Sequence, residues 1–222
     1  MCGRYGRTSA AEAFAKVIDA MVSPKLDDTP GYNRPPGTFQ AVGLVRPDTG
    51  ETTIGPAWWG FIPNWASDDK LSPINARSET AADKKLFARA FARQRCLIAL
   101  DYWIEWQRGE GGKQPYAIRP AGGHPFFLAG IWSKAAKLPE DHAAAGHVTF
   151  AILTGQPNPD IAHIHNRQPQ VLTAKAARAW IDPDGEHLDD ILTDGQHTNY
   201  ESWPIAKRAG KSSKNDKGVL TA

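Results

Sequence analysis

The sequence has only two cysteines, Cys2 and Cys96, among its 222 residues. Two cysteines cannot form the disulfide framework of a small secreted protein, and they are too few for a zinc site built on cysteine. Such scarcity is typical of proteins from a reducing compartment. We therefore expect a cytoplasmic protein that uses neither a metal nor another cofactor.

Long apolar runs and an excess of charge are also missing. No apolar stretch approaches the roughly 20 residues that span a bilayer. The residues after Arg4 and Arg7 are too polar for a signal peptide. The formal net charge of +2 does not support a generally basic nucleic-acid-binding surface, but it leaves room for a local arginine cluster. We expect a monomer that makes no contact with membranes.

Short apolar segments separated by Gly- and Pro-rich turns predict many strands and few helices. The predicted strands cover 39–46, 51–57, 96–100, 114–119, 125–132 and 147–154. Ser9 and Glu12 form a capping-box pattern that predicts a helix over roughly 9–22. The order is not βαβ, so we expect an α+β protein, mainly antiparallel β, with peripheral helices. We expect one domain over 1–206 and a flexible, basic C-terminal tail over 207–222.

The first residues, Met1-Cys2-Gly3-Arg4-Tyr5, carry the most distinctive chemistry. Loss of Met1 would leave Cys2 with a thiol and a free α-amine on adjacent carbons. An α-amine titrates near 7.7–8.0, so part of it is neutral at pH 7. Such an amine can condense with an aldehyde to a Schiff base, and the thiol can then close a thiazolidine ring. The competing interpretation is an incidental cysteine on a frayed terminus.

Six blocks of sequence, in this order and spacing, resemble the SOS-response-associated peptidase family from Met1 to about Trp180. The blocks are Cys2-Gly3-Arg4-Tyr5, Tyr32-Asn33-Arg34-Pro35-Pro36-Gly37, Trp59-Gly60-Phe61-Ile62-Pro63-Asn64-Trp65, Asn75-Ala76-Arg77-Ser78-Glu79-Thr80, Glu105-Trp106 and His165-Asn166-Arg167. The resemblance implies a compact, barrel-like β core. It also implies autoproteolytic loss of Met1 and covalent capture, through Cys2, of abasic sites in single-stranded DNA. We therefore expect a nucleoid-associated protein of the DNA damage response whose partner is single-stranded DNA containing abasic sites.

The resemblance also implies roles for particular residues. Glu105 becomes the general acid or base, since burial between tryptophans can raise a carboxyl pKa toward neutrality. Asn75 orients the Cys2 amine, and His165 assists proton transfer because it fits the family's His-x-Arg pattern. The residues alone leave simpler alternatives open: Glu105 as a surface residue of an edge strand, and Asn75 as a turn cap.

DNA contacts are expected from arginines and tryptophans. Arg4, Arg77 and Arg167 are candidate phosphate ligands, since a guanidinium can bind phosphate through two hydrogen bonds. Trp59 and Trp65 are candidate stacking platforms for bases. At least one of these tryptophans is expected in the core, and Trp65 is the one expected at the surface.

The sequence departs from the family pattern at Ala66, at Tyr102-Trp103-Ile104 before Glu105, and at Asn166 and Gln168. These departures affect the expected base contacts. Two other functions stay open at this point. One is an N-terminal-nucleophile thiol peptidase using Cys2 with His165 and Glu105 or Asn75. The other is a non-catalytic reader of modified DNA bases.

Overall fold

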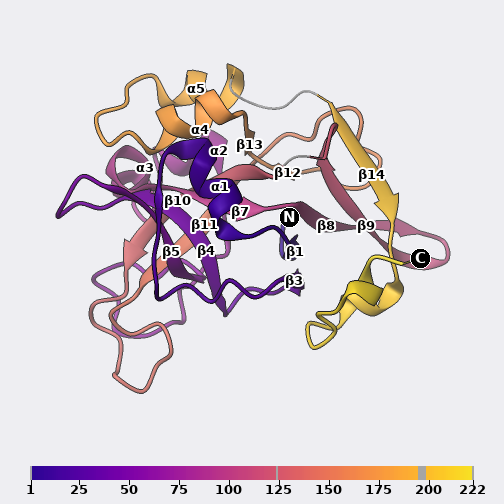
Figure 1. The fold of residues 1–222 in the computed structure, drawn as a ribbon, viewed down its shortest axis with the longest axis horizontal. Coiled ribbons are helices and arrows are strands. Elements are labelled where there is room, and N and C mark those ends of the chain that lie inside the picture. Colours follow the sequence, from indigo (N-terminus) through magenta and orange to yellow (C-terminus); the bar gives the residue numbers. More distant parts are fainter. Residues whose placement is uncertain (1, 124, 195–198, 222) are drawn as a thin grey trace.

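The computed structural model describes residues 2–123, 125–194 and 199–221, and it places their strands in two sheets (Figure 1). The smaller sheet has five strands in the order β14-β9-β8-β1-β3. They are β14 (Tyr200–Pro204), β9 (Gly112–Pro120), β8 (Tyr102–Gly109), β1 (Tyr5–Arg7) and β3 (Gly31–Arg34). All neighbouring pairs in this sheet are antiparallel.

The larger sheet closes on itself. Its order is β12-β11-β10-β7-β4-β5-β2, with β13 added at β10 and β6 at β11. These strands are β2 (Met21–Val22), β4 (Phe39–Val45), β5 (Thr52–Trp59), β6 (Asn75–Arg77), β7 (Arg95–Leu100), β10 (Phe126–Lys134), β11 (Val148–Gly155), β12 (Gln168–Pro169) and β13 (Val171–Leu172). A parallel pairing of Thr149 with Trp58 and Phe150 with Trp59 joins β11 to β5. Strands β11, β10, β7, β4 and β5 thereby form a closed barrel.

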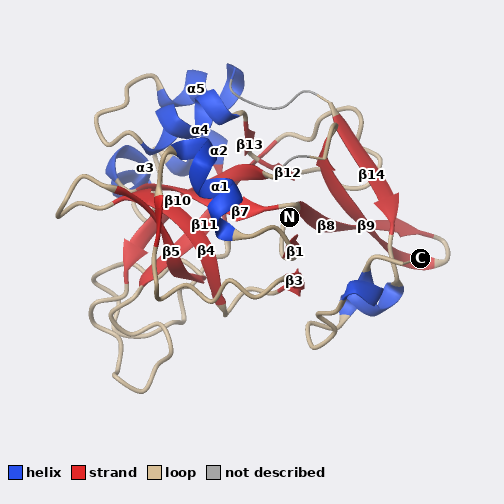
Figure 2. Ribbon diagram, viewed as in Figure 1, coloured by secondary structure: helices blue, strands red, loops and turns tan. Residues whose placement is uncertain are grey.

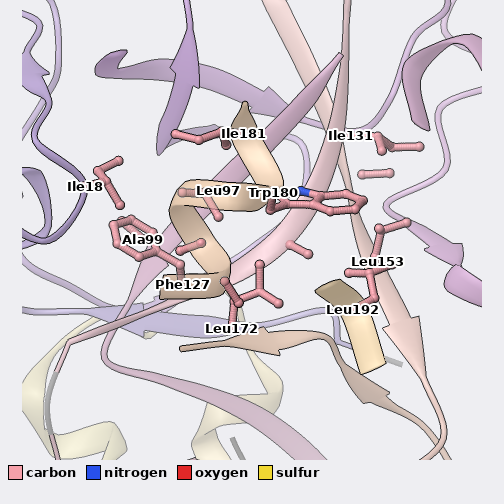
Figure 3. Packing of buried hydrophobic residues seen from close by; sticks show 14 of the residues in the cluster. Ile18, Leu97, Ala99, Phe127, Ile131, Leu153, Leu172, Trp180, Ile181 and Leu192 are labelled. Carbon is pink, nitrogen blue, oxygen red and sulfur yellow. The ribbon is translucent and has the colours of Figure 1, made fainter. Parts of the chain in front are cut away.

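The barrel wall is apolar on both faces, which explains the continuous apolar run of β7. All six residues of β7 are buried. Leu97 and Ala99 belong to a cluster shared with the helices, including Trp180 (Figure 3). Cys96, Ile98 and Leu100 belong to a second cluster that contains Cys2 and Tyr5. The second cluster thus anchors the amino-terminal segment to the barrel.

The α-helices are short and gather on one side of the barrel (Figure 2). They are α1 (Ala11–Ile18), α2 (Ser78–Ala81), α3 (Ala88–Arg93), α4 (Ala174–Ile181) and α5 (Leu188–Asp194). The fold is therefore α+β and mainly β with a barrel core, and this prediction is confirmed. Within the described ranges, no helix is long and apolar enough to cross a membrane.

The predicted capping box is wrong. The side chain of Ser9 donates to Asp101 instead of capping α1. The backbone N–H of Ala11 is satisfied by the carboxylate of Asp28, 3.0 and 3.1 Å from its two oxygens. The helix ends at Ile18, and the following residue, Asp19, has a left-handed conformation with φ of 53°. The following Met21 and Val22 form β2 instead of a last helical turn.

In the described structure, the segment expected as a flexible tail over 207–222 packs against the smaller sheet. Two 3-10 turns, η1 (Lys207–Gly210) and η2 (Lys217–Val219), lie against the smaller sheet. Ala209 and Val219 are fully buried in a cluster with Ile104 and Ala117. The high lysine content concealed these two apolar anchors, because the polar residues between them dominate the composition.

Candidate active site

The amino-terminal segment enters the smaller sheet as β1, which lies between β8 and β3. Tyr5 pairs with Trp103, and the N–H of Ile104 donates to the carbonyl of Arg4 at 2.9 Å. Strand β8 continues beyond this point to Gly109, where it pairs only with β9 among the described strands. The chain before Tyr5 therefore turns away from the sheet beside Glu105, and this places Cys2 at the end of β1.

Cys2 is completely buried, with 0% of its surface exposed. Its sulfur donates to the carbonyl oxygen of Arg4 over 3.9 Å. Burial raises the pKa of the thiol far above its ordinary value, and the negative charge of Glu105 raises it further. The thiol is therefore protonated at neutral pH, and it becomes a nucleophile only when a nearby base takes its proton.

Asn75 holds Cys2 from the barrel side. It opens β6, which pairs in parallel with β11 through Ile152. Its Nδ2 donates to the carbonyl oxygen of Cys2 at 2.9 Å. Its Oδ1 is buried without a hydrogen-bond partner among the described residues. The expected contact with the Cys2 amine is thus not the one seen, but an unused acceptor lies on the same side chain.

Glu105 lies on β8 and is 3% exposed. Its neighbour on the same face of the strand, Trp103, is fully buried. The alternative of a surface glutamate is therefore wrong, whereas a carboxyl group close to the Cys2 thiol fits its effect on that thiol's pKa. A carboxyl group in such surroundings can exchange protons with Cys2.

His165 lies in the loop between Ile164 and β12, outside any helix or strand. The N–H of Arg167 donates to Nδ1 of His165 at 3.0 Å, and the carbonyl of Arg167 lies 3.2 Å from the same atom. Nδ1 therefore has a backbone partner both as an acceptor in the neutral ring and as a donor in the protonated ring. Both contacts fix the orientation of the imidazole ring beside the groove.

Arg4, Glu105 and His165 come together around one groove. A cavity of about 520 Å³ is lined by Arg4, Glu105, Trp106, Arg108, Lys113, His165 and Gly210. A second cavity of about 380 Å³ shares Trp106, Arg108 and His165 with it. Neither cavity includes Cys2 in its lining, since the thiol is buried beside them. The groove is rich in cations and holds one buried carboxyl group.

Arg77 and Arg167, the other two predicted phosphate ligands, differ in whether they form an ion pair. Arg77 is exposed at the end of β6 on the same face as Asn75, two residues away, and it forms no salt bridge within the described ranges. Arg167 binds Glu79 through two hydrogen bonds of 2.6 and 2.8 Å, and it lowers the pKa of that carboxyl group. This ion pair ties Arg167, and with it the loop that carries His165, to α2.

Trp59 and Trp65, the two predicted stacking residues, differ in burial. Trp59 is 0% exposed, lies parallel to Phe150 and donates from Nε1 to the carbonyl of Ile74. The expectation that it stacks on DNA bases is wrong, because its ring is part of the barrel core. Trp65 is 62% exposed, which agrees with the expectation that it is the surface member of the pair.

Sequence reasoning missed Trp106, Arg108 and Lys113 as groove residues. Arg108 and Lys113 lie directly opposite each other in the β8–β9 hairpin. Like charges in this position repel, so a bound anion would relieve an unfavourable pair. The signal was present in the sequence as two cations placed symmetrically about the Gly109–Gly112 turn.

Within the described ranges no group of three or more His, Cys, Asp or Glu could hold a metal ion.

Comparisons with known proteins find relatives over the full length of the chain. The chain is 32% identical to the abasic site processing protein YedK of Escherichia coli, covering 99% of this chain and 98% of that protein. It is 29% identical to the abasic site processing protein YoaM of Bacillus subtilis, covering 100% and 98%. A phage-related protein from Bordetella bronchiseptica has a similar structure, with a TM-score of 0.72, 28% identity and coverage of 93% and 95%.

A protein from Bacteroides thetaiotaomicron shares the fold over the full length of both chains, with a TM-score of 0.78 and 19% identity. The family described as SOS response associated peptidase matches residues 1–212. That match covers the amino-terminal cysteine, the barrel, the groove and the start of the docked C-terminal segment. The chain belongs to the SOS response associated peptidase family.

Proposed function

We propose that this protein captures abasic sites in single-stranded DNA covalently through Cys2, after removal of Met1, and so shields the lesion during the response to DNA damage. The observation that carries the proposal is the position of Cys2, which Asn75 holds by its carbonyl beside the buried Glu105. The relatives named as abasic site processing proteins support it. A groove with several cations is suited to a nucleic-acid backbone.

The first step is hydrolysis of the peptide bond between Met1 and Cys2, catalysed by the protein itself. One water molecule is consumed, methionine leaves, and the α-amine of Cys2 is released. The free Oδ1 of Asn75 is then an acceptor for that amine, while Nδ2 keeps the Cys2 carbonyl in place. A held amine reacts faster than a mobile one because its orientation is already set.

Capture then follows in two bond-forming steps. The amine nitrogen attacks the aldehyde carbon of the ring-opened abasic sugar, and loss of water gives an imine. The Cys2 sulfur next bonds to the imine carbon, and its proton ends on the ring nitrogen of the thiazolidine. Because burial keeps the thiol protonated, this step needs a proton carrier, and Glu105 and the Nε2 of His165 are the two candidates at the site.

A thiol peptidase that cleaves other proteins is less well supported. Such enzymes use an exposed, easily ionised thiolate. Here the thiol is fully buried and its pKa is raised. The protein would therefore cleave its own first peptide bond without cleaving added peptides, and digestion of a peptide mixture checks this.

The deciding experiment incubates the protein with an oligonucleotide carrying one abasic site and resolves the products on a denaturing gel. Wild type should give a heat-stable shifted band, and its intact mass should lack one methionine. Cys2→Ala should give no stable band, although borohydride should trap its imine. Cys96→Ala, which alters the other buried thiol, is the matched control and should crosslink normally.

A Cys2→Ala protein that crosslinks as well as wild type would contradict the proposal. Wild-type protein that retains Met1 and still crosslinks would contradict the role of the amine. Arg77→Ala should weaken binding to an unmodified single strand with less effect on the chemistry. A non-catalytic reader of modified bases would instead bind DNA without ever forming the shifted band.

A further inference from the structure

The C-terminal segment from η1 to η2 is fastened to β3 by two asparagines. Nδ2 of Asn33, which is fully buried, lies 3.0 Å from each of the carbonyl oxygens of Ala209, Lys211 and Lys214, and these three acceptors share its two hydrogens. In return, Oδ1 of Asn215 accepts the N–H groups of Tyr32 and Asn33, at 2.6 and 2.7 Å. Because breaking these bonds would leave buried polar groups unsatisfied, the path of the segment is fixed.

Asn33 also connects this segment to the groove. Oδ1 of Asn33 accepts from Nη1 of Arg4 at 3.4 Å, and that nitrogen also lies 3.4 Å from the carbonyl of Ala209. Gly210 lines the larger cavity together with Arg4. The segment is therefore one wall of the groove, on the side of Arg4.

This wall carries a high density of positive charge. Its cations are Lys207, Arg208, Lys211, Lys214 and Lys217. Arg208 is paired with Asp216. The four lysines are exposed, and none has an acidic partner within the described part of the chain. Lys211 and Lys214 use only their carbonyls in the attachment, so their ammonium groups extend from a fixed backbone without contributing to it.

We propose that residues 207–217 form a fixed basic wall that binds the phosphates of the DNA strand next to the captured nucleotide, chiefly through Lys211 and Lys214. The inference rests on the proposed function and adds a direction to it, since the strand must leave the groove past Arg4. Nucleic acid is favoured over an acidic protein because this wall continues the cationic lining of Arg4, Arg108 and Lys113.

The test compares wild type with the double variant Lys211→Gln, Lys214→Gln. Each lost contact with a single strand should reduce the salt dependence of log affinity by about 0.7, so the slope should become about 1.4 less steep. Affinity for a long unmodified strand should fall several-fold. Lys175→Gln, on α4, is the matched control and should bind as wild type does.

The direction is tested with strands extended on only one side of the abasic nucleotide. The double variant should lose affinity for one of the two polarities and bind the other normally. Asn215→Ala keeps every lysine but loosens the wall, and it should also weaken binding to the affected polarity. Unchanged affinity and slope in the double variant would overturn the inference, and normal binding by Asn215→Ala would overturn the need for a fixed wall.

These outcomes are distinct from failure of the proposed function. Binding to an unmodified strand is measured in a Cys2→Ala background, so it does not depend on crosslinking. If wild type crosslinks and the lysine changes have no effect on binding, only the inference of the basic wall is contradicted. A lysine effect on binding without any crosslink would remove only the covalent capture.

Discussion

The side-chain amide of Asn75 donates to the main-chain carbonyl of Cys2 over 2.9 Å, while its own oxygen stays buried without a hydrogen-bond partner in the described structure. One residue thus fixes the backbone of the nucleophile and retains an acceptor close to it. A buried acceptor without a partner is costly, so a structure that keeps one gains from filling it. The free amine of Cys2 would supply the missing hydrogen.

Asn75→Ala should slow crosslinking by at least about tenfold, the effect of misplacing one reacting group. The free energy of unfolding should change by only about 1 kcal/mol, the usual net value of one hydrogen bond. Single-turnover gels measure the first quantity and urea unfolding the second. A variant that crosslinks at the wild-type rate would show that Asn75 only supports the fold.

The two tryptophans of the aromatic loop should respond in opposite ways. Trp59→Ala should destabilise the protein by about 3–5 kcal/mol, as expected for a large aromatic side chain lost from a core. Trp65→Ala should leave stability nearly unchanged and weaken single-strand binding by about 1–3 kcal/mol if its exposed ring stacks on a base. Thermal unfolding and fluorescence anisotropy separate the two effects. Equal DNA affinity in Trp65→Ala would remove this ring from the DNA path.

Asp28 should be one of the most sensitive charged residues. It pairs with Arg7, whose side chain is 1% exposed, with Nη1 and Oδ1 2.5 Å apart. Asp28→Ala would leave that buried charge unpaired and remove the acceptor at the start of α1, so a loss of about 3 kcal/mol is expected. Asp48→Ala breaks the exposed pair with Arg46 and should cost less than about 1 kcal/mol. Similar losses in chemical unfolding for both variants would contradict this reasoning.

Stability should decline in alkaline solution. Burial raises the pKa values of Cys2, Cys96 and Tyr5 in the folded protein. The unfolded chain ionises at about 8.5 for a thiol and about 10 for a tyrosine, so above these values it binds fewer protons than the fold does. The free energy of unfolding must then fall as pH rises, by about 1.4 kcal/mol per unit for each thiol.

Unfolding curves between pH 7 and 10 measure this dependence. The stabilisation is fully present below about pH 8.5 and is lost progressively above it. Cys96→Ala removes one of the two buried thiols and should flatten the decline between about 8.5 and 10. A stability that stays constant up to pH 10 would mean that the buried thiols do not remain protonated in the fold.

The sequence alone predicted the fold class, because apolar runs such as that of β7 need burial on both faces. It did not predict how the barrel closes, since the parallel pairing of β11 with β5 joins residues about ninety positions apart and leaves no local pattern. The capping box failed for a related reason: Asp101 and Asp28, both distant in sequence, took over the two hydrogen bonds.

For the site, the resemblance predicted Cys2, Asn75, Glu105 and His165, and the structure brings Asn75 and Glu105 to Cys2. Their detailed contacts were beyond sequence reasoning. The ion pair of Arg167, a predicted phosphate ligand, with Glu79 was not evident because the two residues lie far apart in the chain. The lysines near the C-terminus looked like a solvated tail, because the hydrogen bonds of Asn33 to their carbonyls involve no side-chain pattern.

The position of β1 between β8 and β3 decides how the protein should be labelled for study. An affinity tag placed before Cys2 would occupy the amine on which the proposed chemistry depends. A tag after residue 221 would adjoin the segment that closes the groove. The turn between β4 and β5, at Pro47–Gly50, is exposed and belongs to neither feature. A short epitope or a fluorophore inserted there should report on binding without disturbing it.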